Sequence, residues 1–248
     1  MFGCDIHEEM PLAHIHGADD IARPERRVRA RGLRLQPGTY HLLRHERAYH
    51  YYRLVDKNRI EAFSDGVLAI IITIMVLNLT VPATPDISEL KSRLPIFLTY
   101  ALSYLYVGIY WNNHHHLLKT ARRARGAVMW ANLHLLFWLS LFPFMTGWMG
   151  ENHFAAAPTA VYGFVLMMAG IAYFILQSTI VADHGHDSKL AEELGKDWKG
   201  KLSIVLYAAG IGIAFWHAWI SSGIYTIVAL FWLIPDKRLE RVIHELGE

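Results

Sequence analysis

Six stretches of apolar residues, separated by short polar segments, constrain the fold of this chain more than any other feature of its 248 residues. Hydrophobic residues make up 53% of the sequence, and most of them lie in these blocks. A helix of about 20 apolar residues, rising ~1.5 Å per residue, matches the ~30 Å hydrocarbon core of a bilayer. The pattern predicts an all-α, polytopic membrane protein with six transmembrane helices. The predicted spans are 63–81, 94–118, 127–149, 159–181, 202–219 and 224–234.

The polar segments predict the domain organisation and the orientation. Residues 1–56 are rich in Arg and His and lack a long apolar stretch, so we expect a disordered or partly helical arm and no signal peptide. Residues 57–235 form the transmembrane domain, and residues 236–248 form a charged tail. Lys and Arg gather in the 119–125 loop and in the tail, whereas the 150–158 turn has neither. The positive-inside rule therefore places both termini in the cytoplasm, for a protein of the inner (plasma) membrane.

Turn signals predict two of the helix boundaries. Pro82 and Pro85 are expected to end the first block, and 86–93 is expected to be a short loop. One helix over 202–234 would be about 50 Å long, which exceeds the bilayer core. We therefore expect a turn at 221–223, where two serines precede a glycine.

The first block begins with a charged segment, Arg59-Ile60-Glu61-Ala62-Phe63-Ser64-Asp65. A carboxylate at the depth of Asp65 is costly in lipid, so it marks a functional or an interhelical site. Arg59 lies six residues earlier, about 240° around a helix, and cannot pair with Asp65 on one face. We therefore expect its partner on another helix.

Several amides and imidazoles fall at the same depth as Asp65 if the first three blocks cross the membrane in alternating directions. They can hydrogen-bond one another and Asp65 across helices. Two interpretations remain open: a gate-supporting or proton-sensing network, and a structural clamp that fixes the first helix against the next two. A metal site is the weaker option, because adjacent histidines on a helix point about 100° apart. The candidate clamp residues are Ser64, Asp65, Asn113, His114, His115, His116, Asn132 and His134.

A stripe of four residues recurs on one face of the first helix, at Gly66, Ile70, Thr73 and Leu77. The spacing i, i+4, i+7, i+11 is that of a single helical face. By itself, such a stripe indicates packing against lipid or against a neighbouring helix.

The motif Arg-x-x-x-Phe-Ser-Asp, followed by Gly-Val-x-Ala-Ile-x-x-Thr, resembles the first transmembrane helix of the transmembrane-protein-175 family. The resemblance covers residues 57 to about 241. It implies a potassium-permeable cation channel, and no enzyme, whose pore is lined by the first helix. It further implies that Ile70 forms a narrow hydrophobic constriction, that Thr73 contributes to cation selectivity and that Leu77 forms a second apolar layer. The residues of the polar motif are Arg59, Phe63, Ser64 and Asp65.

The single copy of the motif implies a homotetramer in the lipid bilayer, with potassium and other monovalent cations as permeants. We expect no cofactor, no bound metal and no nucleic-acid partner. The alternative is a histidine-based membrane redox or metal-binding protein. A di-haem bundle would need His pairs near both membrane faces, whereas the histidines here cluster near one. A secondary transporter would need inverted repeats with broken helices, and the sequence shows no such symmetry.

Overall fold

The computed structural model describes the backbone of residues 37–121, 125–184 and 198–233, with side chains from Lys57 on and that of His184 left out. The chain divides into two units, residues 1–56 and 57–248. Residues 37–56 of the first unit are helical. The same helix extends to Leu77 in the second unit. The expectations for residues 1–36 and for the tail 236–248 concern residues outside the described ones.

The described residues outside short loops are helical. Five helices, or helix pairs, are long and apolar enough to cross a membrane, and they begin at Lys57, Leu94, Gly126, Ala156 and Trp198. The predicted class of polytopic, all-helical membrane protein is therefore confirmed. The helices are α3 (Pro37–Leu77), α4 (Ile87–Ser92), α5 (Leu94–Thr120), α6 (Gly126–Ser140), α7 (Phe142–Glu151), α8 (Ala156–His184) and α10 (Trp198–Leu233).

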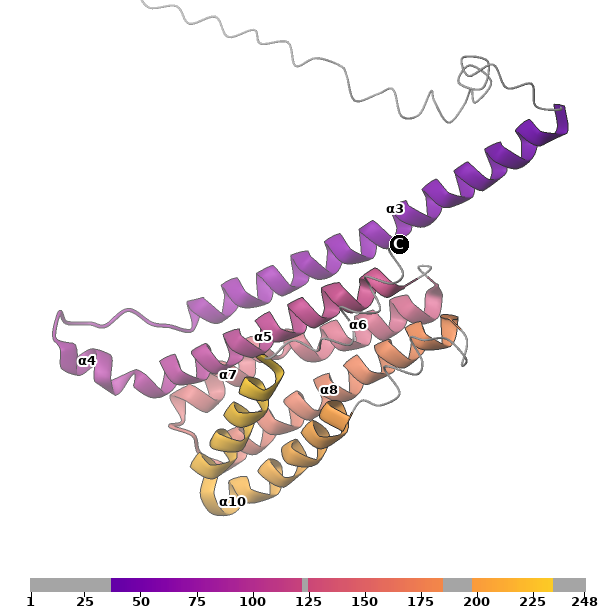
Figure 1. Cartoon of the computed structure of the whole chain (residues 1–248). Coiled ribbons are helices and arrows are strands. Elements are labelled where there is room, and N and C mark those ends of the chain that lie inside the picture. Colours follow the sequence, from indigo (N-terminus) through magenta and orange to yellow (C-terminus); the bar gives the residue numbers. More distant parts are fainter. Residues whose placement is uncertain (1–36, 122–124, 185–197, 234–248) are drawn as a thin grey trace, which may run out of the picture. The chain divides into compact units, whose positions relative to one another are not determined.

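The helices of the second unit form a bundle around α8 (Figure 1). Helix α8 packs against α6, α7 and α10, and α5 packs against α7 and α10. The part of α3 from Lys57 to Leu77 lies at the edge of this bundle, along α5. It approaches the bundle mainly through side chains, and one of its sides is exposed among the described residues of the single chain.

The third predicted span is two helices. Helix α6 ends at Ser140 and α7 begins at Phe142, with Leu141 between them. Pro143 lies in the first turn of α7, where its missing N–H is tolerated, but a continuous helix would drive its ring into the carbonyl four residues earlier. The predicted third span over 127–149 is confirmed as one apolar span, Gly126–Glu151, in which the helix is interrupted just before this proline.

The first span ends earlier than predicted. Helix α3 stops at Leu77, four residues before Val81, and turn hydrogen bonds follow from Asn78 N to Met75 O and from Leu79 N to Val76 O. In a continuing helix the ring of Pro82 would clash with the carbonyl of Asn78, four residues earlier, which accounts for an end of the helix before that residue. The 86–93 segment, expected to be a loop, contains the short helix α4.

Helix α10 folds back on itself at His217, whose φ of −146° and ψ of 82° are not helical. Ser221 Oγ donates to Gly210 O at 2.7 Å, and Trp232 Nε1 donates to Ser203 Oγ at 2.8 Å. Residues 29 positions apart in one straight helix would be more than 40 Å apart, so these bonds define an antiparallel hairpin. The fifth and sixth predicted spans are therefore the two antiparallel arms of α10, but the predicted turn at 221–223 was wrong by several residues.

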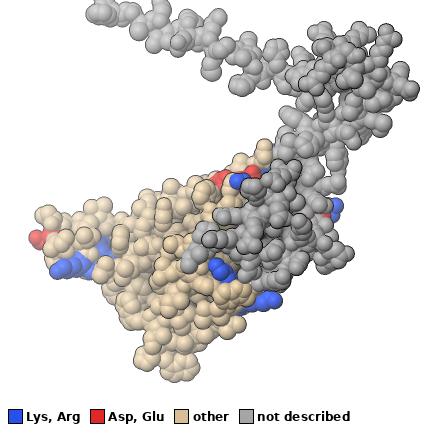
Figure 2. All heavy atoms as spheres, in the orientation of Figure 1, with Lys and Arg blue, Asp and Glu red and all other residues tan. Residues whose placement is uncertain are grey.

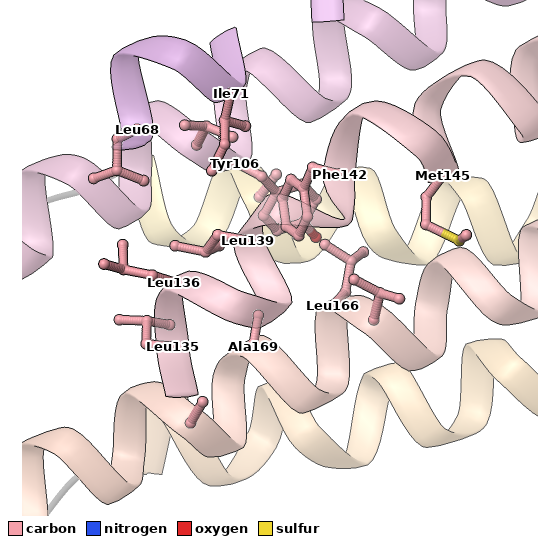
Figure 3. Close-up of a cluster of buried hydrophobic side chains, with 14 of the residues drawn as sticks. Leu68, Ile71, Tyr106, Leu135, Leu136, Leu139, Phe142, Met145, Leu166 and Ala169 are labelled. Atoms are coloured by element: carbon pink, nitrogen blue, oxygen red, sulfur yellow. The ribbon is translucent and has the colours of Figure 1, made fainter. Parts of the chain in front are cut away.

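The core of the bundle is filled by large apolar side chains from five helices (Figure 3). It includes Ile71 of α3, Tyr106 of α5, Leu139 of α6, Phe142 of α7 and Leu166 of α8, all buried. Phe142 packs edge-on against Tyr106, with ring centroids 6.4 Å apart. Close packing of this kind is typical of the interior of a folded protein.

Charged side chains gather at the two ends of the described bundle and leave an uncharged belt between them (Figure 2). We call one of these the basic end. There, Lys57 Nζ donates to Lys119 O at 2.9 Å, and Arg125 pairs with Asp183 at 2.6 Å. The opposite end carries α4 with Glu89. An uncharged belt between two charged rims is what a bilayer requires of a protein that spans it.

Candidate functional site

Helix α3 faces the bundle with one narrow stripe of buried residues. These are Ser64, Leu68, Ile71 and Met75, at the spacing i, i+4, i+7, i+11. Leu68 and Ile71 extend into the core formed by α6 and α7 (Figure 3). We call these four residues the buried stripe.

The predicted face of Gly66, Ile70, Thr73 and Leu77 is exposed along its whole length in the single chain. Each residue follows one of the buried stripe by two positions, a rotation of about 200° around the helix. Ile70 is 57% exposed and Leu77 is 77% exposed. We call these four residues the exposed stripe. The hydroxyl of Thr73 donates to Ile70 O at 2.9 Å, which holds its side chain against its own helix.

A buried polar network connects α3 to the next two spans near the basic end. Asn132 Nδ2 of α6 donates to Ser64 Oγ at 2.9 Å, and His114 Nε2 of α5 lies 2.7 Å from Asn132 Oδ1. An amide oxygen only accepts, so Nε2 of His114 donates in this pair. All three side chains are buried. Buried polar groups in a membrane need such partners, and this network fixes the rotation of α3 against α5 and α6.

Asp65 is held by a different residue from those expected. Its Oδ1 accepts from Trp111 Nε1 of α5 at 3.0 Å. The carboxylate is exposed in the single chain and close to the basic end. The partner comes from the second span, as the helical geometry indicated, and Arg59 is exposed. An indole N–H at a membrane interface seeks an acceptor, and that was the signal in the sequence for Trp111.

Three of the four remaining clamp candidates have their contacts outside the polar network, and the fourth, His116, contacts the His115 ring. The Asn113 side chain donates to Ile109 O of its own helix at 2.9 Å. The His115 ring stacks on Trp111, with centroids 6.3 Å apart. His134 accepts from Trp138 Nε1 at 3.0 Å. The structure therefore brings together Ser64, Asn132 and His114. It places Asn113, His115 and His134 in other contacts.

A second polar contact holds the opposite end of α3. Asn78 Nδ2 donates to Pro143 O at 2.8 Å, across to the first turn of α7. Gly147 makes room for it, because a Cβ at that position would lie 3.3 Å from Asn78 Nδ2. The sequence analysis missed Asn78. A lone amide near the end of an apolar block, facing a proline in another block, is too weak a signal to find the pair.

Among the described residues, no three His, Cys, Asp or Glu side chains are grouped so that they could hold a metal ion. The three adjacent histidines show why: His114 points to Asn132, whereas His115 stacks on Trp111. The His115 ring also contacts that of His116, with centroids 5.8 Å apart, whereas His114 faces away from both toward Asn132.

Replacing Trp111 with Phe tests how much the contact with Asp65 contributes. We expect a loss of only about 0.5 kcal/mol in the free energy of unfolding, because the bond is exposed and the ring is kept. Denaturant titration of the purified protein in detergent measures this. A loss above about 2 kcal/mol would mean that Asp65 and not the buried network holds α3 in place.

The fold and these contacts define a class: a multi-pass helical membrane protein whose first membrane helix presents one uncovered face. Comparison with known proteins identifies the member of that class. The family model described as the endosomal/lysosomal potassium channel TMEM175 matches residues 59–143. The chain belongs to the TMEM175 family.

Two relatives extend this match over most of the chain. A protein of Chryseobacterium sp. (strain P1-3), named a potassium channel, is 53% identical over 189 residues, which cover 76% of this chain and 98% of the relative. A protein of Streptomyces collinus, also named a potassium channel, is 28% identical over 71% of this chain and 91% of its own. Relatives of this kind are channels and not enzymes.

A solved structure has the same fold. It is the crystal structure of a lysosomal potassium-selective channel TMEM175 homolog from Chamaesiphon minutus, with a TM-score of 0.64 and 26% sequence identity. The similarity covers 73% of this chain and 97% of the other.

Proposed function

We propose that this protein is a potassium-permeable cation channel in which the exposed stripe of α3 lines the pore. Ile70 forms the narrow hydrophobic constriction, Thr73 lies one turn further along and contributes to selectivity, and Leu77 forms a second apolar layer. Potassium and other monovalent cations are the permeants, and no cofactor takes part. The relatives named potassium channels support this assignment.

One observation carries the proposal: the exposed stripe lies almost opposite the buried stripe on the same helix. The contacts of α3 with the bundle use only one side, and the other side bears a Thr and a Gly among aliphatic residues. The described core next to α3 is packed with side chains, so we place the ion path between copies of the chain. Each chain supplies one α3, and we propose that four chains form the pore around a common axis.

The physics of such a pore differs from that of a carbonyl-lined filter. An apolar ring offers no ligands to replace the hydration shell of an ion, so it opposes passage by its narrow width and by dewetting. A ring of threonine hydroxyls next to it offers oxygen ligands at a short distance. We infer that conductance depends mainly on Ile70 and that discrimination between cations depends more on Thr73.

We propose that the basic end of the bundle faces the cytoplasm and that the protein resides in the inner (plasma) membrane. The Lys and Arg residues near that end, Lys57, Lys119 and Arg125 among them, support this orientation through the positive-inside rule. Lipid then covers the outward faces of the bundle. The polar network of Ser64, Asn132 and His114 acts in this proposal as a clamp that sets which face of α3 meets the pore axis.

The histidine-based redox or metal-binding alternative is not favoured. The relatives are channels, and no three His, Cys, Asp or Glu side chains among the described residues are grouped to hold a metal ion. A purified protein with a Soret absorption band would revive this alternative.

Ion flux from liposomes tests the function. The purified protein is reconstituted into vesicles loaded with potassium, and efflux is followed with a fluorescent reporter of the potential that the ion gradient drives. We expect potassium flux that scales with the amount of protein, and a smaller flux when sodium replaces potassium. Monodisperse, folded protein that leaves the vesicles as tight to both cations as empty vesicles would contradict the proposal.

Thr73→Ala tests the assignment of selectivity. We expect the ratio of potassium to sodium permeability to change by about threefold or more, while total conductance changes less, because the change removes one hydroxyl and little bulk. Thr73→Ser keeps the hydroxyl and serves as the matched control. Reversal potentials under mixed ion gradients give the ratio. If Thr73→Ser and Thr73→Ala shift it equally, the hydroxyl is not the selective group.

A further inference from the structure

A cavity of about 230 Å³ lies away from α3, between α5, α8 and the two arms of the α10 hairpin. Its deep end is formed by Tyr106 and Tyr207, near the middle of the bundle. Its other end, close to the basic end, is lined by Lys201, Phe174 and Trp232. Phe174 and Lys201 are exposed there, so the cavity opens at this end.

The walls of the cavity offer few partners to water. Tyr106 Oη donates to Tyr225 O at 2.6 Å, and Tyr207 Oη donates to Tyr106 Oη at 3.3 Å. Tyr173 Oη donates to Asn113 O at 3.2 Å. These hydroxyls are therefore used within the protein, and the wall they leave is mostly aromatic and aliphatic. A mostly apolar wall offers water few hydrogen bonds, and an empty cavity forfeits the dispersion contacts of its lining. An apolar occupant fits the site better than water does.

The mouth of the cavity has the chemistry of a lipid headgroup region. Lys201 lies at its rim, and Lys199 lies two residues earlier, with its Nζ 4.8 Å from the centre of the Phe231 ring. The Trp232 indole donates to Ser203 Oγ beside it. Trp and Lys at one level are typical of the membrane interface, and Lys attracts anionic lipids.

We propose that this cavity binds one acyl chain of an anionic phospholipid, with the phosphate of the headgroup beside Lys201. The chain enters from the bilayer at the mouth and extends between α5 and α8 toward Tyr106 and Tyr207. The cation at the rim favours an anionic headgroup over a zwitterionic one. The site is separate from the exposed stripe of α3 and does not depend on the channel proposal.

Gly170 of α8 provides a way to fill the cavity. A Cβ at this position would lie 3.9 Å from Tyr110 Oη and 3.9 Å from Tyr207 Cε2, both ordinary contacts. The backbone therefore tolerates a side chain at this place, and a Leu there would occupy the space of the acyl chain. Gly212 of α10 is the matched control, since a Cβ there meets nothing within 4 Å and the residue does not line the cavity. Ile204→Phe, on the α10 wall, is a second filling variant.

Photolabelling in vesicles tests the proposal. The full-length protein is reconstituted in phosphatidylcholine vesicles that contain phosphatidylglycerol with a diazirine on one acyl chain, and labelled peptides are mapped by mass spectrometry after illumination. We expect labels on the cavity walls of α5, α8 and α10. Gly170→Leu and Ile204→Phe should each lower wall labelling by about tenfold, and Gly212→Leu should leave it unchanged. Lys201→Gln should lower labelling by phosphatidylglycerol about fivefold, to the level given by the same chain on phosphatidylcholine.

Four results would overturn the proposal. One is wall labelling that is equal in wild type and both filling variants. Another is labelling confined to the outer surface of the bundle. A third is stronger wall labelling by a diazirine fatty acid than by phosphatidylglycerol, which would make a free fatty acid the ligand. The last is cross-linking of the walls to a second copy of the chain, which would make a neighbouring subunit the occupant. Elution volume on size exclusion shows that each variant is folded, so no result depends on ion flux.

Discussion

Replacing Ile70 with Asn is expected to raise cation flux by about tenfold, which corresponds to a barrier lower by ~1.4 kcal/mol. In the proposed tetramer, four Ile70 side chains form the narrowest ring. Four Asn side chains in this ring would keep water in the constriction. Their amide oxygens would also replace some of the water ligands that an ion loses as it passes. The same change should weaken discrimination between potassium and sodium, because the hydrated width of the pore increases. Single-channel recording gives the conductance, and reversal potentials give the selectivity.

The control for this experiment has to be an exposed residue on another side of α3. Ile71 is unsuitable because it is 3% exposed and belongs to the core, where an Asn would unfold the protein. Val76 is 44% exposed and lies about 120° around the helix from Ile70. Val76→Asn should leave conductance near that of the wild type. Equal increases in the two variants would mean that the pore face has been misassigned and that the exposed stripe faces lipid.

Replacing Asn132 with Leu should have the largest effect on stability among changes at the polar network. Leu has a similar volume, so little space is opened, but Ser64 and His114 both lose their partner inside the membrane. We expect the free energy of unfolding to fall by about 2 kcal/mol, at about 1 kcal/mol for each group left unpaired. Unfolding of the purified protein in mixed micelles with increasing sodium dodecyl sulfate measures the change.

Asn113→Leu is the matched substitution. Its amide lies on α5 next to His114, but it donates to Ile109 O of the same helix. We expect a change within about 0.5 kcal/mol. If Asn113→Leu lowers the free energy of unfolding as much as Asn132→Leu does, the interhelical network contributes no more to stability than a bond within one helix. Wild-type stability in Asn132→Leu, together with altered ion selectivity, would instead favour the gate-supporting interpretation over the clamp.

Hydropathy predicted the class of fold because a bilayer allows few alternatives: apolar blocks of sufficient length have to form helices. Structural details that depend on a single residue were harder to predict from the sequence. The break at Leu141 follows from Pro143, but prolines are often accommodated inside membrane helices, so the sequence could not show whether this helix is interrupted. The turn between the last two spans lies at His217, whereas the more usual turn residues Ser221 and Gly223 are helical.

Part of the site followed from periodicity and depth. The spacing on the first block predicted one face, and the structure leaves that face exposed. Shared depth predicted that amides and imidazoles from the next two spans would meet this helix, and Asn132 and His114 do meet Ser64. Depth gives no rotation about the helix axis, however, so it could not tell His114 from His115. For the same reason it missed Trp111, the residue that bonds Asp65.

The extended backbone at His217 sets the parity of the membrane crossings. With the hairpin, Trp232 returns to the end of the bundle where α10 began, beside Ser203. If α10 ran straight through, the number of passages would be odd, and the chain after Leu233 would start on the other side of the membrane. That segment includes Lys237, Arg238 and Arg241. The positive-inside rule, which also orients the loops, disfavours the transfer of such cations across a bilayer. In the topology proposed above, this one non-helical residue places the carboxyl-terminal segment in the compartment that the amino-terminal end of the first span also faces, and a protein that recognises this segment would have to reside there.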